Sequence, residues 1–209
     1  MKKRGLFISV EGIDGAGKST HVRFIQEYLQ QNGKDVITTR EPGGTELGEK
    51  IRDLLLHHNK AMHKITELLL MFASRQELIH NIIEPSLNDG ICVIADRFID
   101  ASIAYQGAGR GVGIENIKKI ISILDPVVNT DLTILFDTTL DVAFGRITRN
   151  RNKDRIENET ADFFATVQQA YRDIALKDPK RVKIITTDQH IDKTRELIVQ
   201  QLDILLGIE

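Results

Sequence analysis

The run of residues best suited to chemistry lies near the start of the chain and combines glycines with a lysine and a serine. Its spacing, G-x-x-x-x-G-K-[ST], is typical of a phosphate-binding loop between a strand and a helix. Glycines let the backbone curl so that successive N–H groups face a polyphosphate, and the N-terminus of the following helix adds positive charge. We expect Lys18 to reach the β- and γ-phosphates and Ser19 to bind Mg²⁺. The loop consists of Gly12, Ile13, Asp14, Gly15, Ala16, Gly17, Lys18 and Ser19.

A second reactive pair, Asp96 and Arg97, follows the apolar run 91–95. A carboxylate at the C-terminal end of a parallel strand is well placed to hold Mg²⁺ and its waters beside bound phosphates. The planar guanidinium of Arg97 can bind a phosphate bidentately. Taken alone, the two residues fit a surface ion pair equally well.

Cations also gather in residues 146–160, a polar segment nearly free of apolar side chains. Such a segment is typical of a solvated loop that can move, and we call it the lid. Phosphoryl transfer spreads negative charge over the transferred group, and donors on a mobile segment stabilise that charge while excluding water. A solvated charge run is the plainer alternative. The cations are Arg146, Arg149, Arg151, Lys153 and Arg155.

Short β-branched runs alternate with segments of helical period along the chain. This alternation predicts an α/β fold of the P-loop NTPase type, with a five-stranded parallel sheet flanked by helices on both faces and a mobile lid. Because there is no repeat or linker, residues 1–209 are expected to form one domain. The expected strands are Leu6–Val10, Asp35–Thr39, Ile91–Ala95, Leu132–Phe136 and Val182–Thr186.

The composition narrows the class of protein. The 209 residues carry a net charge of −2, without the basic surplus typical of proteins that bind duplex nucleic acid. Cys92 is the only cysteine, so no internal disulfide can form. No apolar run approaches the ~18 residues of a membrane span, and the N-terminal one is too short for a signal peptide. We therefore expect a cytoplasmic protein with a small-molecule substrate and neither a nucleic-acid nor a membrane partner.

The segment Leu68–Ala73 is apolar all round within a stretch of helical period. More than one face of this helix must therefore be covered. A central core helix explains the pattern, and a subunit interface is a compatible addition.

Taken together, these motifs resemble those of the thymidylate kinase family over essentially the whole chain and in the family's order. The Arg-Glu-Pro-Gly-Gly-Thr segment combined with Asp-Arg-Phe is much more specific than the phosphate loop. The resemblance implies transfer of the γ-phosphoryl group of ATP to dTMP with Mg²⁺, giving dTDP and ADP for dTTP biosynthesis, and a homodimer. The matching segments are 11–20, 39–45, 96–98, 104–107, 109–111 and 154–157.

The resemblance also implies roles around the acceptor phosphate and sugar. Asp14 would meet the 3′-hydroxyl of dTMP. Arg97 would clamp its phosphate, with Arg40 and Glu41 nearby. Tyr105 would crowd the 2′ position, because a rigid ring can reject an added hydroxyl sterically.

Around the base, the resemblance implies that Arg75 donates to a thymine carbonyl and that Ser102 meets the base. Gln106 belongs to the same substrate-binding set. The family usually places a Phe four residues before the thymine-reading arginine, but here Met71 holds that position and Phe72 follows it. A thioether can also pack on an aromatic face, so both remain candidates for the thymine contact.

On the donor side, one form of the family uses a basic residue in the phosphate loop and the other uses lid arginines. Position 15 is glycine here and the lid is rich in arginine, so the chain is similar to the second, bacterial form. Thr20 extends the ATP-binding loop, and Arg146 would stack on adenine. The candidates for the catalytic charge, besides Lys18 and Arg97, are Arg149, Arg151 and Arg155.

Two other functions stay open. A kinase of another monophosphate or small metabolite would keep Lys18 and the lid, but would leave Tyr105 and segment 40–45 without a purpose. A nucleotide-binding switch would need no acceptor clamp such as Arg97. A GTPase is disfavoured, because the nearest candidate for an N-K-x-D run, at 59–62, lacks the Asp.

Overall fold

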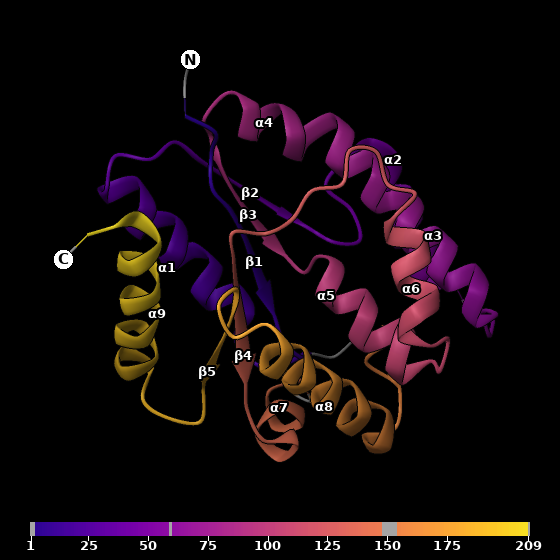
Figure 1. Cartoon of the computed structure of the whole chain (residues 1–209). Coiled ribbons are helices and arrows are strands. Elements are labelled where there is room, and N and C mark those ends of the chain that lie inside the picture. The colour runs from indigo at the N-terminus through magenta and orange to yellow at the C-terminus, as the bar shows by residue number, and fades with distance from the viewer. Residues whose placement is uncertain (1–2, 59, 148–153, 209) are drawn as a thin grey trace.

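The computed structural model describes residues 3–58, 60–147 and 154–208, built around one parallel sheet (Figure 1). The strands are β1 (Phe7–Glu11), β2 (Val36–Arg40), β3 (Cys92–Asp96), β4 (Leu132–Asp137) and β5 (Val182–Thr186). They follow the order β2-β3-β1-β4-β5 and confirm the expected α/β fold. Every observed strand end lies within one residue of its expected position.

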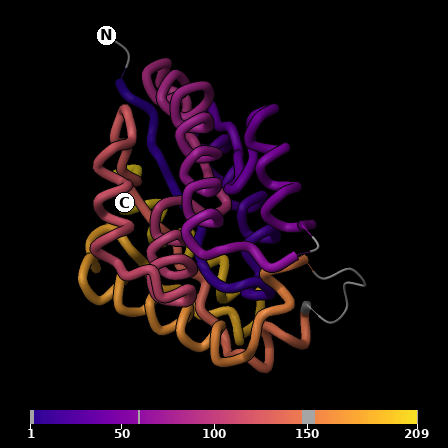
Figure 2. The backbone as a smooth tube through the Cα atoms, turned by 90° about the vertical axis from the view of Figure 1, so that its right-hand side faces the viewer, coloured from indigo at the N-terminus to yellow at the C-terminus, as the bar shows by residue number. Residues whose placement is uncertain are grey.

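Helices cover both faces of this sheet. They are α1 (Lys18–Gln31), α2 (Glu46–His57), α3 (Lys64–Leu78), α4 (Glu84–Asn88), α5 (Ile99–Ser102), α6 (Ile114–Ile121), α7 (Leu140–Ile147), α8 (Ala161–Lys177) and α9 (Ile191–Leu206), with π-helical turns η1 (Ile79–Ile83) and η2 (Ile103–Gly109). On one face α1 packs beside α9, and on the other α8 packs on β4 and β5 (Figure 1). The segments α3, η1 and α4 form one continuous helical rod, against which α2 packs (Figure 2). None of the helices within the described ranges is long and apolar enough to cross a membrane.

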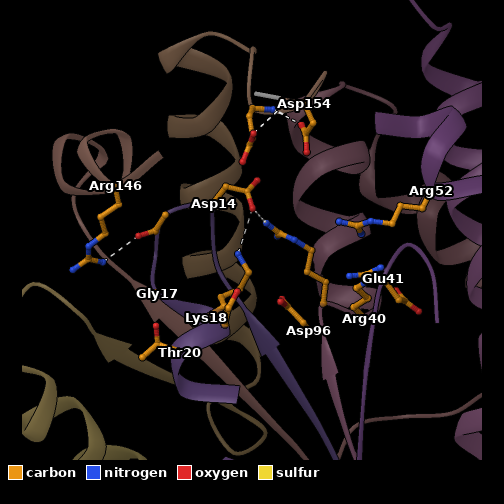
Figure 3. Close-up of a pocket in the computed structure, with 14 residues that line it drawn as sticks. Asp14, Gly17, Lys18, Thr20, Arg40, Glu41, Arg52, Asp96, Arg146 and Asp154 are labelled. Atoms are coloured by element: carbon orange, nitrogen blue, oxygen red, sulfur yellow. Dashed lines mark hydrogen bonds and ion pairs between the residues drawn. The ribbon is translucent and has the colours of Figure 1, made fainter. Parts of the chain in front are cut away.

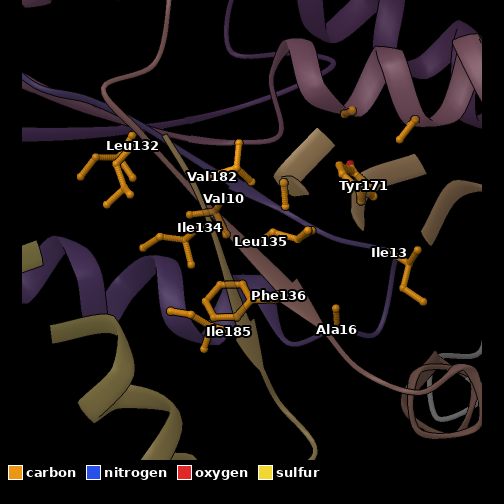
Figure 4. Close-up of a cluster of buried hydrophobic side chains, with 14 of the residues drawn as sticks. Val10, Ile13, Ala16, Leu132, Ile134, Leu135, Phe136, Tyr171, Val182 and Ile185 are labelled. Atoms are coloured by element: carbon orange, nitrogen blue, oxygen red, sulfur yellow. The ribbon is translucent and has the colours of Figure 1, made fainter. Parts of the chain in front are cut away.

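The core explains why four of the six residues of β4 are apolar. Ile134 and Phe136 point toward α1, whereas Leu135 points the other way, toward Tyr171 of α8 (Figure 4). Successive side chains of a strand alternate between the two faces, so a strand covered on both faces needs no polar position. Each such buried side chain contributes roughly 1.5–3 kcal/mol relative to an exposed one.

The topology also decides where a ligand can bind. The chain leaves β1 through α1 on one face of the sheet and leaves β3 through helices on the other face. The carboxyl ends of β1 and β3 therefore bound a crevice, which is the usual ligand position in an open parallel sheet. The phosphate loop and the Asp96–Arg97 pair both lie at this edge.

The apolar segment of α3 is only partly accounted for by the core. Leu68, Met71 and Phe72 are buried, which confirms the core helix. Leu69 is 56% exposed and Ile65, one turn earlier, is 40% exposed. An uncovered apolar row therefore remains on α3, and the subunit interface stays a prediction.

Candidate active site

The loop after β1 has the geometry that its glycine spacing predicts. Gly12, Gly15 and Gly17 have φ angles of 131°, 79° and 94°, a region that L side chains rarely adopt. A Cβ at position 15 would also lie 2.3 Å from the carbonyl oxygen of Ala143 in α7, so a side chain there is excluded. Because α1 begins at Lys18, its first N–H groups lie at the loop without intrahelical acceptors. The segment is therefore built to bind an anion.

The side chains of Lys18, Asp14 and Arg97 form one charged cluster at this loop. The Lys18 ammonium donates to the carbonyl oxygens of Gly12 and Ile13, both at 3.0 Å, and lies 3.6 Å from Asp14. The Arg97 Nη2 donates to Asp14 at 2.7 Å. Burial opposes ionisation of Asp14, but the Arg97 and Lys18 charges outweigh it and lower the pKa of Asp14 to about 2. Asp14 is therefore a carboxylate throughout the physiological pH range.

Arg97 has an unusual backbone conformation, with a φ of 74°. A non-glycine residue in this region costs roughly 1–2 kcal/mol, so its surroundings must impose the conformation. The Arg97 N–H donates to the Val10 carbonyl at 3.0 Å, and the next N–H, of Phe98, donates to Glu11 Oε1 at 2.8 Å. Tyr171 Oη donates to the other oxygen of Glu11 at 2.8 Å. Glu11 therefore anchors the turn that aims Arg97.

Glu11 has no exposed surface, and its burial raises the pKa of its carboxyl group. Burial, followed by the nearby Asp100 charge, raises the pKa of Glu11 to about 8. Glu11 therefore keeps its proton between the usual glutamate pKa of 4.5 and about 8, where an ordinary glutamate is ionised.

A pocket of about 510 Å³ opens in front of the phosphate loop (Figure 3). Cationic side chains from five parts of the chain line it together with Asp96, whose Oδ1 is buried and accepts no hydrogen bond from any described residue. Ser19 and Thr20 lie on the same wall. The lining cations are Lys18, Arg40, Arg52, Arg97 and Arg146.

The structure describes only two of the cations predicted for the lid, and these two have different contacts. Arg146 donates to the carbonyl oxygens of Gly15 (3.1 Å) and Thr187 (3.0 Å), beside the phosphate loop. Arg149, Arg151 and Lys153 lie outside the described residues. Arg155 donates to Glu67 and to the Leu55 carbonyl, both at 2.8 Å, and does not line the large pocket. Its catalytic role, and the lid itself, stay predictions.

A second pocket, of about 80 Å³, adjoins the first, and Asp14, Glu41 and Arg97 line both. Its inner wall is largely apolar but carries two polar side chains. Of the two candidates for the base contact, Met71 lines this pocket. Phe72 packs in the core, with its ring centre 4.7 Å from the Arg75 guanidinium carbon. The inner-wall residues are Met71, Ala101, Tyr105, Gln106 and Ile156.

Arg75 lies behind this wall and has no exposed surface. Its guanidinium pairs with Glu41 through Nε and Nη2 and donates to Ser102 Oγ at 2.9 Å. Burial raises the pKa of Glu41 despite this partner. The three predicted residues are thus brought together in a buried network, in which Glu41 lines both pockets whereas Arg75 and Ser102 line neither. Their contact with a base stays a prediction.

Tyr105 connects the second pocket to the charged cluster. The Arg97 Nη2 donates to its hydroxyl at 3.1 Å, and the guanidinium carbon lies 4.8 Å from its ring centre. The ring is therefore held beside Arg97 by a hydrogen bond and a cation–π contact.

Sequence reasoning missed Arg52, Glu11 and Tyr171. Arg52 lines both pockets and donates to the Pro42 carbonyl at 2.9 Å, but its place on an amphipathic helix gave no signal. Glu11 could have been found, since a carboxylate that ends an otherwise apolar strand needs a partner or a proton. Tyr171 fitted the apolar face of α8 and carried no separate signal.

Comparison with known proteins gives a consistent result. The family model described as thymidylate kinase matches residues 10–198. The thymidylate kinase of Ruthia magnifica is 46% identical over 207 residues, covering 99% of both chains. That of Nitrosomonas europaea is 44% identical over 198 residues, covering 95% of this chain and 92% of the other. The crystal structure of thymidylate kinase from Ehrlichia chaffeensis superposes with a TM-score of 0.77 at 34% identity, covering 96% and 99% of the two chains.

Proposed function

This chain belongs to the thymidylate kinase family, and we propose that it transfers the γ-phosphoryl group of ATP to dTMP, giving dTDP and ADP. The observation that carries the proposal is the cluster of Lys18, Asp14 and Arg97. This cluster connects the phosphate loop to the second pocket, whose largely apolar wall with two polar side chains suits a nucleobase. A nucleotide switch has no use for the second pocket.

The phosphate loop is the donor site. Bound phosphates replace the carbonyl oxygens of Gly12 and Ile13 as partners of the Lys18 ammonium. The polyphosphate charge also offsets burial and the Arg97 charge, which lower the pKa of Lys18 in the free protein. Arg146, held between Gly15 and Thr187, is positioned for the adenine side of ATP.

The residues near the loop fit Mg²⁺. The buried Oδ1 of Asp96 lacks a partner among the described residues, and Ser19 lines the same pocket. No cluster of three acidic, His or Cys ligands occurs in the described part of the chain, which suits a cation held mainly by nucleotide phosphates. When bound, Mg²⁺ neutralises phosphate charge. Ser19 would bind it, with Asp96 ordering its waters.

The second pocket is the acceptor site. Arg97 binds the dTMP phosphate, while Asp14 faces the sugar and Tyr105 closes the space beside its 2′ position. Gln106 and Met71 meet the base. Arg40 and Glu41 support this site from β2 and the turn after it. Ser102 and Arg75 stiffen its wall through their hydrogen bond, and we assign the base carbonyl to Arg75 from the family resemblance.

The chemistry is direct in-line transfer. The attacking oxygen of dTMP is already anionic, so no strong general base is needed. Catalysis rests on positioning and charge neutralisation. Lys18 and Arg97 neutralise charge on the donor and acceptor sides. The lid, residues 146–160, supplies further positive charge from Arg149, Arg151 or Arg155 as it closes.

We also propose a cytoplasmic homodimer without a nucleic-acid partner. The exposed apolar row of Ile65 and Leu69 on α3 supports the dimer. The net charge of −2 lacks the basic surplus typical of proteins that bind duplex nucleic acid. Sedimentation velocity tests the assembly, and a monomer at micromolar concentration would contradict it.

The activity is tested by ADP production from Mg·ATP with dTMP, dUMP, UMP, dGMP or shikimate offered singly. We expect a large response to dTMP, a weaker one to dUMP and little to UMP. A stronger response to another acceptor would overturn the base and sugar contacts. Slow hydrolysis that no acceptor stimulates would favour the nucleotide switch.

A further inference from the structure

We infer that Glu67 is a specificity-determining residue, because it fixes which end of the Gln106 amide faces the acceptor pocket. The inference rests on the proposed function, since it concerns how the same pocket distinguishes pyrimidine bases. Glu67 lies on α3 and Gln106 on η2, so their contact joins two walls of the pocket.

The contact sets the direction of the amide. Gln106 is 1% exposed and lines the smaller pocket. Its Nε2 donates to Glu67 Oε1 at 2.9 Å. An ionised carboxylate only accepts hydrogen bonds, so the amide must turn its NH₂ toward Glu67. The amide oxygen is then left as the free end, and Oε1 is buried without a partner among the described residues.

Glu67 is held in its ionised form. It is 1% exposed, yet Arg110 Nε lies 3.1 Å and Arg155 Nη2 lies 2.8 Å from its Oε2. Burial opposes ionisation, but the Gln106 hydrogen bond and the Arg110 charge outweigh it, and the pKa of Glu67 falls below its usual range. A neutral group at this position could donate to Gln106 and allow the amide to flip.

The fixed amide oxygen has a chemical consequence. Thymine and uracil carry an N3–H donor, which an amide oxygen accepts. Cytosine presents an N3 lone pair, and two acceptors facing each other in a buried site leave both unpaired. A site built to accept a hydrogen bond therefore rejects a base that cannot donate it. Glu67 acts through Gln106 and is a positioning residue.

The test compares dTMP with 5-methyl-dCMP, which keeps the methyl group and sugar but reverses the hydrogen-bonding pattern at N3 and C4. The readout is the ratio of their kcat/KM values. In Glu67→Gln, the new amide can donate to Gln106 Oε1 and release its NH₂ toward the pocket. We expect this ratio to fall by about 10-fold or more, mainly through a higher KM for dTMP.

Two further variants separate orientation from packing. Arg110→Ala removes one ion pair from Glu67 but leaves the Arg155 pair, which keeps Glu67 ionised, and the Glu67–Gln106 hydrogen bond, so it should keep the ratio of the unmodified protein. The exchange Glu67→Gln with Gln106→Glu keeps the total charge of the pair and again points an oxygen into the pocket, so it should restore the preference for dTMP. Circular dichroism and thermal unfolding confirm that each variant is folded.

The outcomes are distinct. If the unmodified protein does not phosphorylate dTMP, the proposed function is wrong. If it does, and a folded Glu67→Gln variant keeps the unmodified ratio, the inference is overturned. If Glu67→Gln does not fold, the exchange variant decides. A preference of the exchange variant for dTMP supports the inference. A ratio of kcat/KM for dTMP to kcat/KM for 5-methyl-dCMP near one in this variant overturns it.

Discussion

The two pockets proposed as donor and acceptor sites share a wall but are built in different ways. The phosphate loop consists of consecutive residues, 12–19, whose conformation follows from the glycine spacing. The acceptor pocket takes Met71 from α3, Gln106 from η2 and Ile156 from the segment before α8. A contiguous motif can thus specify a phosphate-binding loop, whereas the second pocket, proposed to hold the base, depends on packing among distant segments.

Arg97 and Asp14 lie at the boundary between the two regions and line both pockets. Asp14 belongs to the loop, but its carboxylate pairs with a guanidinium from the end of β3. Variants on either side of this pair should therefore separate donor effects from acceptor effects.

The largest effect is expected for Lys18→Ala in the donor pocket. Loss of the ammonium removes charge stabilisation from the transferring phosphoryl group, so kcat should fall by about 1,000-fold or more. ADP production at saturating ATP and dTMP measures this. Lys50→Ala, which removes an exposed i,i+4 ion pair on α2, is the matched control and should have the kcat of the unmodified protein. Activity of Lys18→Ala within ten-fold of normal would remove Lys18 from the mechanism.

Arg97→Ala should affect the acceptor side most. A charge-assisted, bidentate phosphate contact contributes about 1.5–3 kcal/mol, so the KM for dTMP should rise by roughly 10- to 100-fold, with a smaller change in the KM for ATP. Arg23→Ala, an exposed arginine paired with Glu27, serves as the control. An unchanged dTMP affinity would contradict the acceptor clamp.

Arg151→Ala is expected to lower kcat by roughly 10-fold or more, with little change in either KM, since lid charge acts on the transition state. Arg155→Ala should also lower the melting temperature, because this arginine holds Glu67 and the Leu55 carbonyl. Steady-state kinetics and thermal unfolding separate the two effects. Normal turnover in Arg151→Ala would move the catalytic charge to Arg149 or Arg155.

The smallest effect is expected for Glu11→Gln, which should change the pH dependence of the melting temperature. Glu11 lies at the boundary of the two regions. Its pKa is raised from 4.5 to about 8, so its protonated form is favoured by folding. This contribution is fully present below pH 4.5 and is lost as pH rises through about 8. Glu11→Gln mimics the protonated form. It should therefore melt several degrees higher than the unmodified protein at pH 8.5, but not at pH 4.5.

The matched control for this prediction is Tyr171→Phe. It removes the phenol that donates to Glu11 but keeps the titrating carboxyl, so it should retain the loss of stability at high pH. Parallel melting curves for Glu11→Gln and the unmodified protein at both pH values would show that Glu11 does not titrate in this range.

The strands, the phosphate loop and the order of the motifs could be derived from local features. β-branched runs specify strands, and glycine spacing specifies a loop with positive φ angles, because each depends on a few consecutive residues. The pairing of Arg155 with Glu67, the burial of Arg75 and the place of Met71 rather than Phe72 in the lining of the second pocket could not be derived this way.

The sequence by itself thus determined an α/β phosphate-binding protein and the residue types that handle phosphate, since these are properties of short segments. Only the tertiary structure decided which partner each charged side chain takes and which side chains line the second pocket. Those outcomes depend on contacts between residues far apart in the chain. Arg97 illustrates both: its guanidinium could be foreseen after β3, but its φ of 74° is held by Glu11, from a neighbouring strand.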